Sequence, residues 1–222
     1  MKGLMIKDFC FLRTQKHFFI LVLVMTVFIS ITNGQEGNPA TFVLPYLAFA
    51  SSFFVMITVA YDGNDNGNAF LFTLPFSRKT YVAEKYLFGI LTGCICVMAG
   101  FLWILIYLRA TGAAKHTEET LFLAGASIVI TLLFISVMIP CILKFGSERG
   151  RIVLGAVFIV VFIGAYGAEK WMEKEQIRME SISRLGQILG TWGVLAVMIA
   201  VSAVLAAVSF SISTGILNRK EF

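Results

Sequence analysis

The sequence predicts an all-α polytopic membrane protein, with six transmembrane helices, an N-terminal interfacial helix and both termini in the cytoplasm. Apolar residues make up 58% of the 222 residues and charged residues only 14%, whereas a soluble domain is usually about 25% charged. The mean hydropathy is +0.85, and the apolar runs are long enough to cross a bilayer. Since so much of the chain is apolar, we expect residues 1–222 to form a single transmembrane domain.

The N-terminal third contains an interfacial segment and two spans. Residues 1–16 mix Lys and Arg with Leu and Phe, a composition that suits a helix lying in the membrane interface, although the apolar residues spread widely around a helical wheel. We place the first span at about 18–32 and the second at about 40–61. Pro45 lies near the start of the second span, where a helix tolerates proline.

The longest polar stretch on the side of the N-terminus is 62–86, which reads DGNDNGNAFLFTLPFSRKTYVAEKY. Its Asp, Gly and Asn residues favour a chain reversal, and Ser77 is placed to cap a helix that becomes the third span, at about 86–108. Two interpretations remain open. The stretch either docks to a cytosolic partner through its apolar and basic residues, or is an ordinary loop whose positive charges set the topology.

Three further spans complete the six, at about 120–143, 152–168 and 188–213. Pro140 predicts a kink near the end of the fourth span, and residues 144–151 form a basic turn. Residues 169–187 carry both signs of charge, with Glu180 and Arg184 at i,i+4 spacing, so we expect partial helix there. This segment is a lid, a re-entrant helix or a solvated loop.

The distribution of basic residues sets the orientation. With the N-terminus inside, twelve of the eighteen Lys and Arg residues lie on the inner side. These twelve are Lys2, Lys7, Arg13, Lys16, Arg78, Lys79, Lys85, Lys144, Arg149, Arg151, Arg219 and Lys220. The positive-inside rule therefore places both termini and the 62–86 stretch in the cytoplasm.

The spans lack the groups that several other functions need. No Asp, Glu, Lys, Arg or His lies in the middle of a predicted span, which counts against a carrier driven by protons or ions. The chain has no GxxxxGK[ST], HExxH or GxSxG motif, so we expect it not to be an enzyme. Gly89 and Gly93 place small residues on one part of the third span, which permits close helix packing and supports a dimer contact.

Two segments resemble the small bacterial ABC-transporter permeases of the type-2 exporter family. The opening MKGLMIKDFCFLRTQK has the Lys7–Asp8 pair that these proteins carry before their first span. The segment TLPFSRKTYVAEKYL matches their Leu-Pro-x-Ser-Arg-Lys pattern between spans two and three. The matching residues are Leu74, Pro75, Ser77, Arg78, Lys79, Lys85 and Tyr86. Residues 64–68 depart from the pattern, because relatives more often have charged and aromatic residues there.

The resemblance implies an ATP-driven exporter in the bacterial plasma (inner) membrane. Two permeases would pair with two ABC ATPase subunits, which would bind ATP and Mg and hydrolyse the ATP, so no cofactor is expected in this chain. The cargo would be amphipathic, an antimicrobial or cytolytic peptide by analogy with relatives. The second permease is either another copy, making a homodimer, or a related chain.

The resemblance also assigns roles to residues of this sequence. The elbow helix would include Lys2, Leu4, Lys7, Asp8 and Phe9. The coupling helix that docks in the ATPase would comprise Phe72, Thr73, Leu74, Pro75, Phe76, Ser77, Arg78, Lys79 and Tyr81. Two functions of other classes remain as alternatives: an ATP-independent secondary carrier or channel, and a non-transporting membrane scaffold or sensor subunit.

Overall fold

The computed structural model describes residues 2–34, 37–63, 71, 73, 77–112, 117–174 and 176–220, and for residue 2 and parts of 147–189 it describes the backbone alone. Within these ranges the chain is helical apart from short turns, with no strand. The helices are α1 (Lys2–Thr14), α2 (Lys16–Asn33), α3 (Ala40–Gly63), α5 (Arg78–Ala110), α6 (Thr117–Lys174) and α7 (Gln176–Arg219). A helix satisfies its own backbone hydrogen bonds, which a lipid environment requires.

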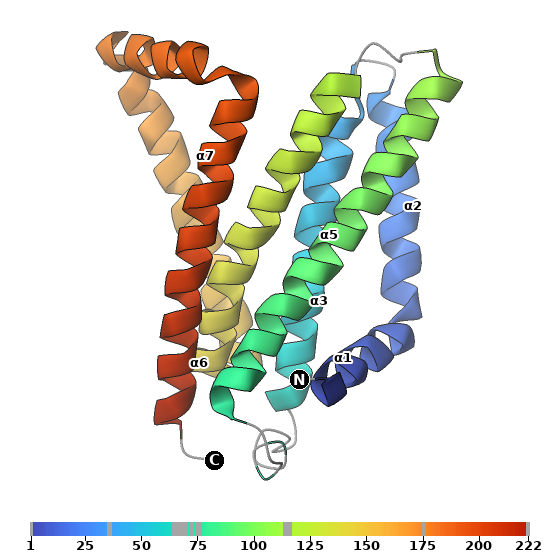
Figure 1. Ribbon diagram of the computed structural model, residues 1–222, viewed down its shortest axis with the longest axis vertical. Helices are drawn as coiled ribbons and strands as arrows, with labels where there is room; N and C mark the ends of the chain where they lie inside the picture. The colour runs from blue at the N-terminus through green and yellow to red at the C-terminus, as the bar shows by residue number, and fades with distance from the viewer. Residues whose placement is uncertain are drawn as a thin grey trace.

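The short helix α1 is separate from the first membrane-length helix. Gln15, with φ −86° and ψ 41°, interrupts the helical backbone between α1 and α2. Figure 1 shows α1 lying across the ends of α3 and α5, whereas α2 runs along the length of the bundle. The predicted short helix before the first span is therefore present.

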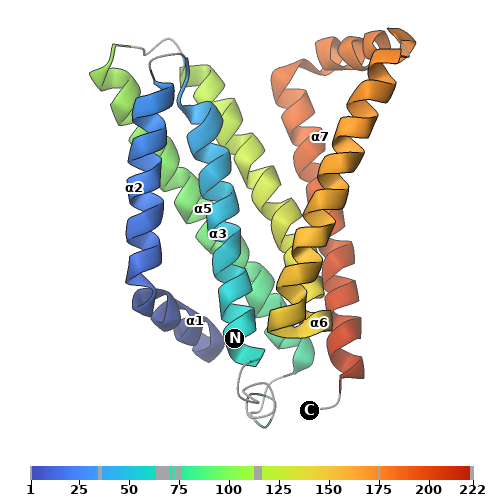
Figure 2. The ribbon, with the colours of Figure 1, turned by 180° about the vertical axis from the view of Figure 1, so that it is seen from behind.

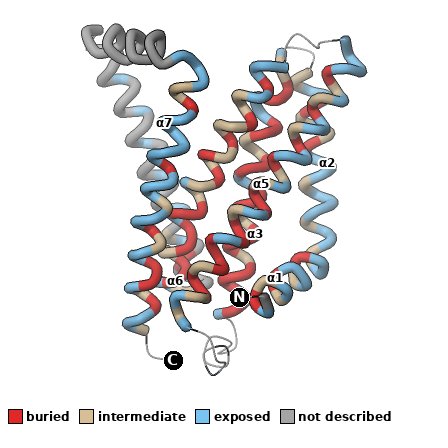
Figure 3. Tube along the Cα trace, viewed as in Figure 1, coloured by how far each residue is buried: buried red, intermediate tan, exposed pale blue. Residues whose placement is uncertain are grey.

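Helix α3 lies at the centre of the fold. It packs against α2, α5 and α6. Of the residues in its apolar membrane-length stretch, 67% are buried, compared with 17% in the corresponding stretches of α2 and α7. Figure 3 shows buried residues concentrated on α3 and on the faces of α5 and α6 beside it. The side chain of Asn38 accepts a hydrogen bond from the backbone N–H of Ala40 at 3.0 Å and so caps the helix start.

The start of α5 confirms the predicted cap. Ser77 has an extended backbone, and its side-chain oxygen accepts a hydrogen bond from the backbone N–H of Thr80. The helix that follows has 33 residues, or about 50 Å at 1.5 Å per residue. It is longer than the hydrocarbon core of about 30 Å, so its first turns can carry charged residues without entering lipid.

Two glycines with positive φ divide α6 and α7. Gly146 (φ 82°) lies in the predicted basic turn 144–151, and Gly190 (φ 66°) begins the last long segment. Positive φ is readily adopted by glycine because it has no Cβ. The break in α6 thus falls at Gly146, and Pro140 lies inside the helix. The segment 169–187 is helical on both sides of residue 175.

Five helical segments are long and apolar enough to cross a membrane, counted among the residues the model describes. They are Lys16–Asn33, Ala40–Gly63, Arg78–Ala110, Thr117–Gly146 and Gly190–Arg219. The predicted span at 152–168 is helical but is not among the five, so the count of six stays a prediction. Figure 2 shows this part of α6 running back beside α7. The two termini lie at one end of the bundle (Figure 1).

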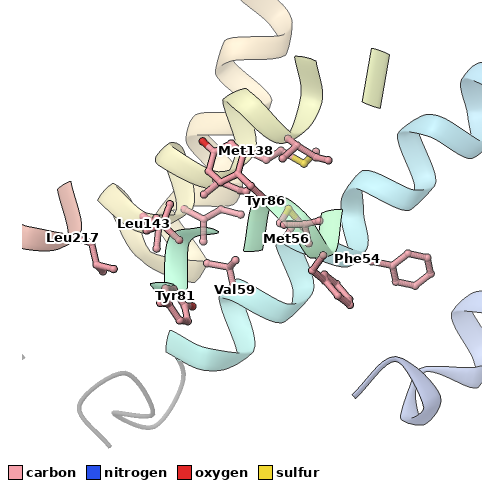
Figure 4. Close-up of a cluster of buried hydrophobic side chains, with 14 of the residues drawn as sticks. Phe54, Met56, Val59, Tyr81, Tyr86, Met138, Leu143 and Leu217 are labelled. Atoms are coloured by element: carbon pink, nitrogen blue, oxygen red, sulfur yellow. The ribbon is translucent and has the colours of Figure 1, made fainter. Parts of the chain in front are cut away.

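An apolar core joins the helices at the end that carries the termini. Figure 4 shows side chains from α3, α5, α6 and α7 meeting there, among them Phe54, Tyr86, Met138 and Leu217. A second buried cluster lies toward the opposite end and consists mainly of residues of α3 and α5. The first core packs directly beside the polar site described next.

Candidate functional site: a buried charge cluster

Charged side chains from three helices meet in the interior at the end of the bundle with the termini. Asp8 comes from α1, Asp62 from the last turn of α3, and Glu84 and Lys85 from the second turn of α5. All four are at most 4% exposed. Because transfer of an isolated charge into a protein interior is costly, this arrangement depends on the pairing of opposite charges.

Lys85 is the central cation of the cluster. Its Nζ lies 2.8 Å from Asp62 Oδ2, donates a hydrogen bond to Asp8 Oδ2 and lies 3.8 Å from Glu84 Oε2. It also lies 5.3 Å from the centroid of the Tyr81 ring, a favourable cation–π distance. One ammonium group therefore links all three helices.

Asp62 receives the most donors. Lys7 Nζ donates to its Oδ1, while Lys85 Nζ and Tyr81 Oη both approach its Oδ2, the latter at 3.0 Å. Lys7 also lies 3.3 Å from Asp8 and is the one cation of the cluster that reaches solvent, with 34% of its side chain exposed. Tyr81 is 1% exposed.

Helical spacing brings these residues together. Leu4, Asp8 and Leu12 are four residues apart on α1, and all three are buried against the neighbouring helices. Residues at i and i+4 share one helix face, so an apolar stripe presents a carboxylate at its middle. Residues of α1 near Asp8 also make ring contacts with the neighbouring helices, Phe9 with Phe88 at 5.4 Å and Phe11 with Tyr61 at 4.5 Å.

Glu84 is the least satisfied member. It is 0% exposed, and neither of its carboxyl oxygens has a hydrogen-bond partner within the described part of the chain. Two ammonium groups thus face three carboxyl groups, which leaves a formal excess of one negative charge when all are ionised. A proton on Glu84 would bring the cluster to neutrality.

The predicted coupling segment borders this cluster. Asp62 precedes this segment in the chain and Tyr81 is its last residue, whereas Phe72, Leu74, Pro75 and Phe76 lie outside the described residues. Thr73, Ser77 and Lys79 are exposed. A partner could reach these three without disturbing the core.

Two residues assigned to that segment have contacts within the chain instead. Arg78 donates from one guanidinium nitrogen to the backbone carbonyls of Leu217 at 2.6 Å and Lys220 at 2.8 Å, so it holds the end of α7. Tyr81 is buried on Asp62. Tyr81 is buried and Arg78 is half-buried, and a contact of either side chain with the ATPase stays a prediction.

The predicted elbow residues all lie on α1. Leu4 and Asp8 face the core, Lys7 bridges two carboxylates, and Phe9 is 41% exposed while touching Phe88. Of Lys2 the model describes the backbone alone, at the start of the helix. Helix α1 is therefore attached to the bundle by charge as well as by apolar contact.

The sequence model of the family described as ABC-2 family transporter protein matches residues 3–216. The chain belongs to this family. No curated protein and no solved structure gives a significant match to the chain. Family membership over nearly the whole length, together with the long apolar helices, identifies a multi-pass membrane component of a transporter.

The glycines expected at a dimer contact of this ABC-2 permease lie inside the subunit. A Cβ on Gly89 would come within 2.7 Å of Val55 and 2.8 Å of Ile135, and one on Gly93 within 2.4 Å of Thr131. Both positions let α5 approach α3 and α6 of the same chain. Both glycines are buried within the single chain, and their role in a contact between two permeases stays a prediction.

The sequence contained signals of the cluster that its interpretation missed. Asp62 counted as a turn former and Lys85 as a cytoplasmic charge, and Glu84 received no role. An acidic residue in the last turn of a helix opposes the helix dipole, so Asp62 at the end of α3 indicated a nearby cation. Within the part of the chain that the structure describes, no group of His, Cys, Asp and Glu is arranged to hold a metal ion.

Proposed function

We propose that this permease is the membrane subunit of an ATP-driven exporter and that a separate ABC ATPase docks at the end of the bundle with the termini. Two copies of the ATPase, with their ATP and Mg, and a second permease, most simply another copy of this chain, would complete the exporter in a bacterial plasma membrane. Family membership supports a transport role. The observation that carries the docking site is the charge cluster beside the 64–76 segment.

The residues that flank this segment in the chain are bound to the helices of the bundle. Residues 64–76 connect Asp62, which binds Lys7 and Lys85, to Ser77, which caps α5. A displacement of the segment therefore moves α1, α3 and α5 together. Arg78 extends the same connection to the C-terminal end of α7. Closure of an ATPase dimer would reach four helices through this one contact.

The character of the spans supports an amphipathic cargo. The chain has 21 Phe residues, and the charged cluster lies at the ends of α3 and α5, away from the middle of the spans. A pathway of this composition suits an apolar or amphipathic molecule better than an ion. A peptide of the antimicrobial or cytolytic kind is the first cargo to assay.

The test is retention of a co-expressed ABC ATPase by the affinity-tagged permease. We expect Lys79→Glu, which reverses an exposed charge at the start of α5, to reduce retention at least tenfold, and Leu74→Asp to do the same. Lys16→Glu is the matched control, because Lys16 is exposed at the start of α2, away from the segment. Arg78 is left unchanged because it holds α7.

Equal retention by all membrane-inserted variants would reject docking at this segment. Retention of an ATPase that no candidate cargo stimulates would favour the scaffold or sensor alternative. Absence of retention by the wild type would remove the support for an ATPase partner.

Glu84 favours one second candidate, a carrier driven by protons. It is buried without a hydrogen-bond partner in the described part of the chain, as a proton-accepting group would be. The permease alone, reconstituted in liposomes with a pH-sensitive dye, distinguishes the two functions. Proton flux by the wild type that is lost in the Glu84→Gln variant would support the proton-driven carrier. The absence of flux in the wild type would favour the exporter.

A further inference from the structure

A groove between α6 and α7 combines an apolar wall with basic side chains. Its volume is 480 Å³, within the range of about 300–1,000 Å³ typical of ligand sites. Phe145, Ile212 and Ile216 contribute to the wall, and Lys144, Arg219 and Lys220 supply the charge. The lining residues include no Asp or Glu. A ligand that fits this lining has an apolar body and an anionic group.

The groove lies where two candidate spans end. Lys144 is two residues before Gly146, at which one span stops, and Arg219 is the last residue of the other. Basic residues at span ends lie at the depth of lipid headgroups. The charged part of the groove is thus at the membrane surface, and its apolar part faces the hydrocarbon.

The apolar wall continues along α7. Val197, Val201, Val204, Val208 and Ile212 are each about half exposed or more, at 49%, 54%, 64%, 52% and 52%. Their spacing of three or four residues places them on one face of the helix. From the first to the last the face extends about 22 Å, more than the roughly 15 Å that half of a bilayer core measures. An acyl chain in the groove would lie along this face.

The C-terminal end of a helix carries partial negative charge and disfavours an anion. In this protein Arg78 donates to the backbone carbonyl of Leu217, in the last turn of α7, and to that of Lys220, the residue after the helix. Its guanidinium offsets the negative end of the helix dipole beside the groove. The local charge therefore attracts a phosphate in spite of the helix terminus.

We propose that this groove binds one anionic phospholipid, with its phosphate between Lys144, Arg219 and Lys220 and an acyl chain along α7. The lining residues of this site include no member of the buried charge cluster. The lipid proposal does not depend on whether an ATPase docks at the 64–76 segment. A bound lipid would bridge the end of α7 to α6 at the Gly146 break.

The experiment titrates the purified full-length chain in detergent with dioleoyl phosphatidylglycerol or dioleoyl phosphatidylcholine and counts bound lipid by native mass spectrometry. We expect preference for phosphatidylglycerol. The double variant Lys144→Gln with Lys220→Gln should weaken its binding about thirtyfold, because each basic side chain near an anionic surface contributes about 1 kcal/mol and 1.4 kcal/mol corresponds to tenfold. Arg13→Gln with Lys16→Gln is the matched control, since it removes two exposed charges of α1 and α2.

Several outcomes would overturn the proposal. Equal binding of the two lipids, or equal loss in the groove variant and the control, would show that the groove is not a lipid site. Full competition by glycerol phosphate at the same concentration would show a phosphate site that makes no use of the apolar wall. A fall in the dimer fraction of the groove variant, with lipid binding unchanged, would assign this face to a second copy of the chain.

Discussion

The pairing between Lys85 and Asp62 should appear as a large coupling free energy in a double-mutant cycle. The two charges are 2.8 Å apart, and at an effective dielectric constant of about 20 their attraction is 332/(20 × 2.8), or about 6 kcal/mol. Desolvation of both ions opposes this attraction. Removal of one partner of a buried pair, which leaves the other charge uncompensated, destabilises by about 3–5 kcal/mol.

We therefore expect Lys85→Met alone to lower the free energy of unfolding by about 3–5 kcal/mol, because Asp8 and Asp62 then share only Lys7. Asp62→Asn alone should lower it by less, about 1–3 kcal/mol, because Lys85 keeps Asp8 and only the charge-assisted hydrogen bonds to Asp62 are weakened. The double variant keeps the 3.3 Å contact between Lys7 and Asp8, so its loss should be less than the sum of the single losses by about 2–3 kcal/mol.

Equilibrium unfolding in mixed detergent micelles, followed by far-UV circular dichroism, measures these differences. Lys79→Met is the matched control, because it removes a lysine from the same helix at an exposed position, where substitutions usually change stability by less than about 0.5 kcal/mol. The reasoning fails if Lys85→Met costs no more than this control. It also fails if the two cluster substitutions are additive within about 0.5 kcal/mol.

Two further predictions concern α5. Arg78→Gln should speed amide hydrogen exchange in the last turn of α7 about tenfold, because it removes the charge-assisted hydrogen bonds to Leu217 and Lys220. At this half-buried position these hydrogen bonds are worth about 1–2 kcal/mol. Unchanged exchange in that turn would contradict the capping role. Gly89→Ala should destabilise by about 1–3 kcal/mol, since its Cβ would lie 2.7 Å from the nearest side-chain atom. Gly215→Ala meets nothing within 4 Å and should stabilise by about 0.5–1 kcal/mol. Thermal unfolding of both variants checks the pair, and equal shifts would refute the packing argument.

Much of the fold could be predicted from the chain alone. The apolar runs predicted helices because a backbone in lipid has to satisfy its own hydrogen bonds, and five membrane-length helices lie where runs were expected. Ser77 predicted the start of α5 because capping depends on one residue and the backbone directly after it. The separate α1 was also predicted. These features depend on local sequence, so local reasoning reaches them.

The glycines show where that reasoning ends. Gly89 and Gly93 predicted close helix packing, and the structure has it, but the partners are α3 and α6 of the same chain. Small residues predict that another helix approaches closely, but they do not indicate which helix it is. The break in α6 falls at Gly146, inside the predicted turn 144–151, whereas Pro140, at which a kink was expected, lies inside the helix.

The charge cluster was decided by the tertiary structure. Lys7 and Asp62 are 55 residues apart, and Asp8 and Lys85 are 77 apart, so no local pattern pairs them. By sequence, Lys85 is one more positive charge at the edge of a span. It is buried because α1 crosses the ends of α3 and α5 and brings Asp8 to it (Figure 1). The sequence determines how many charges the chain holds, but burial and pairing depend on which helices meet, and that is a property of the packed bundle.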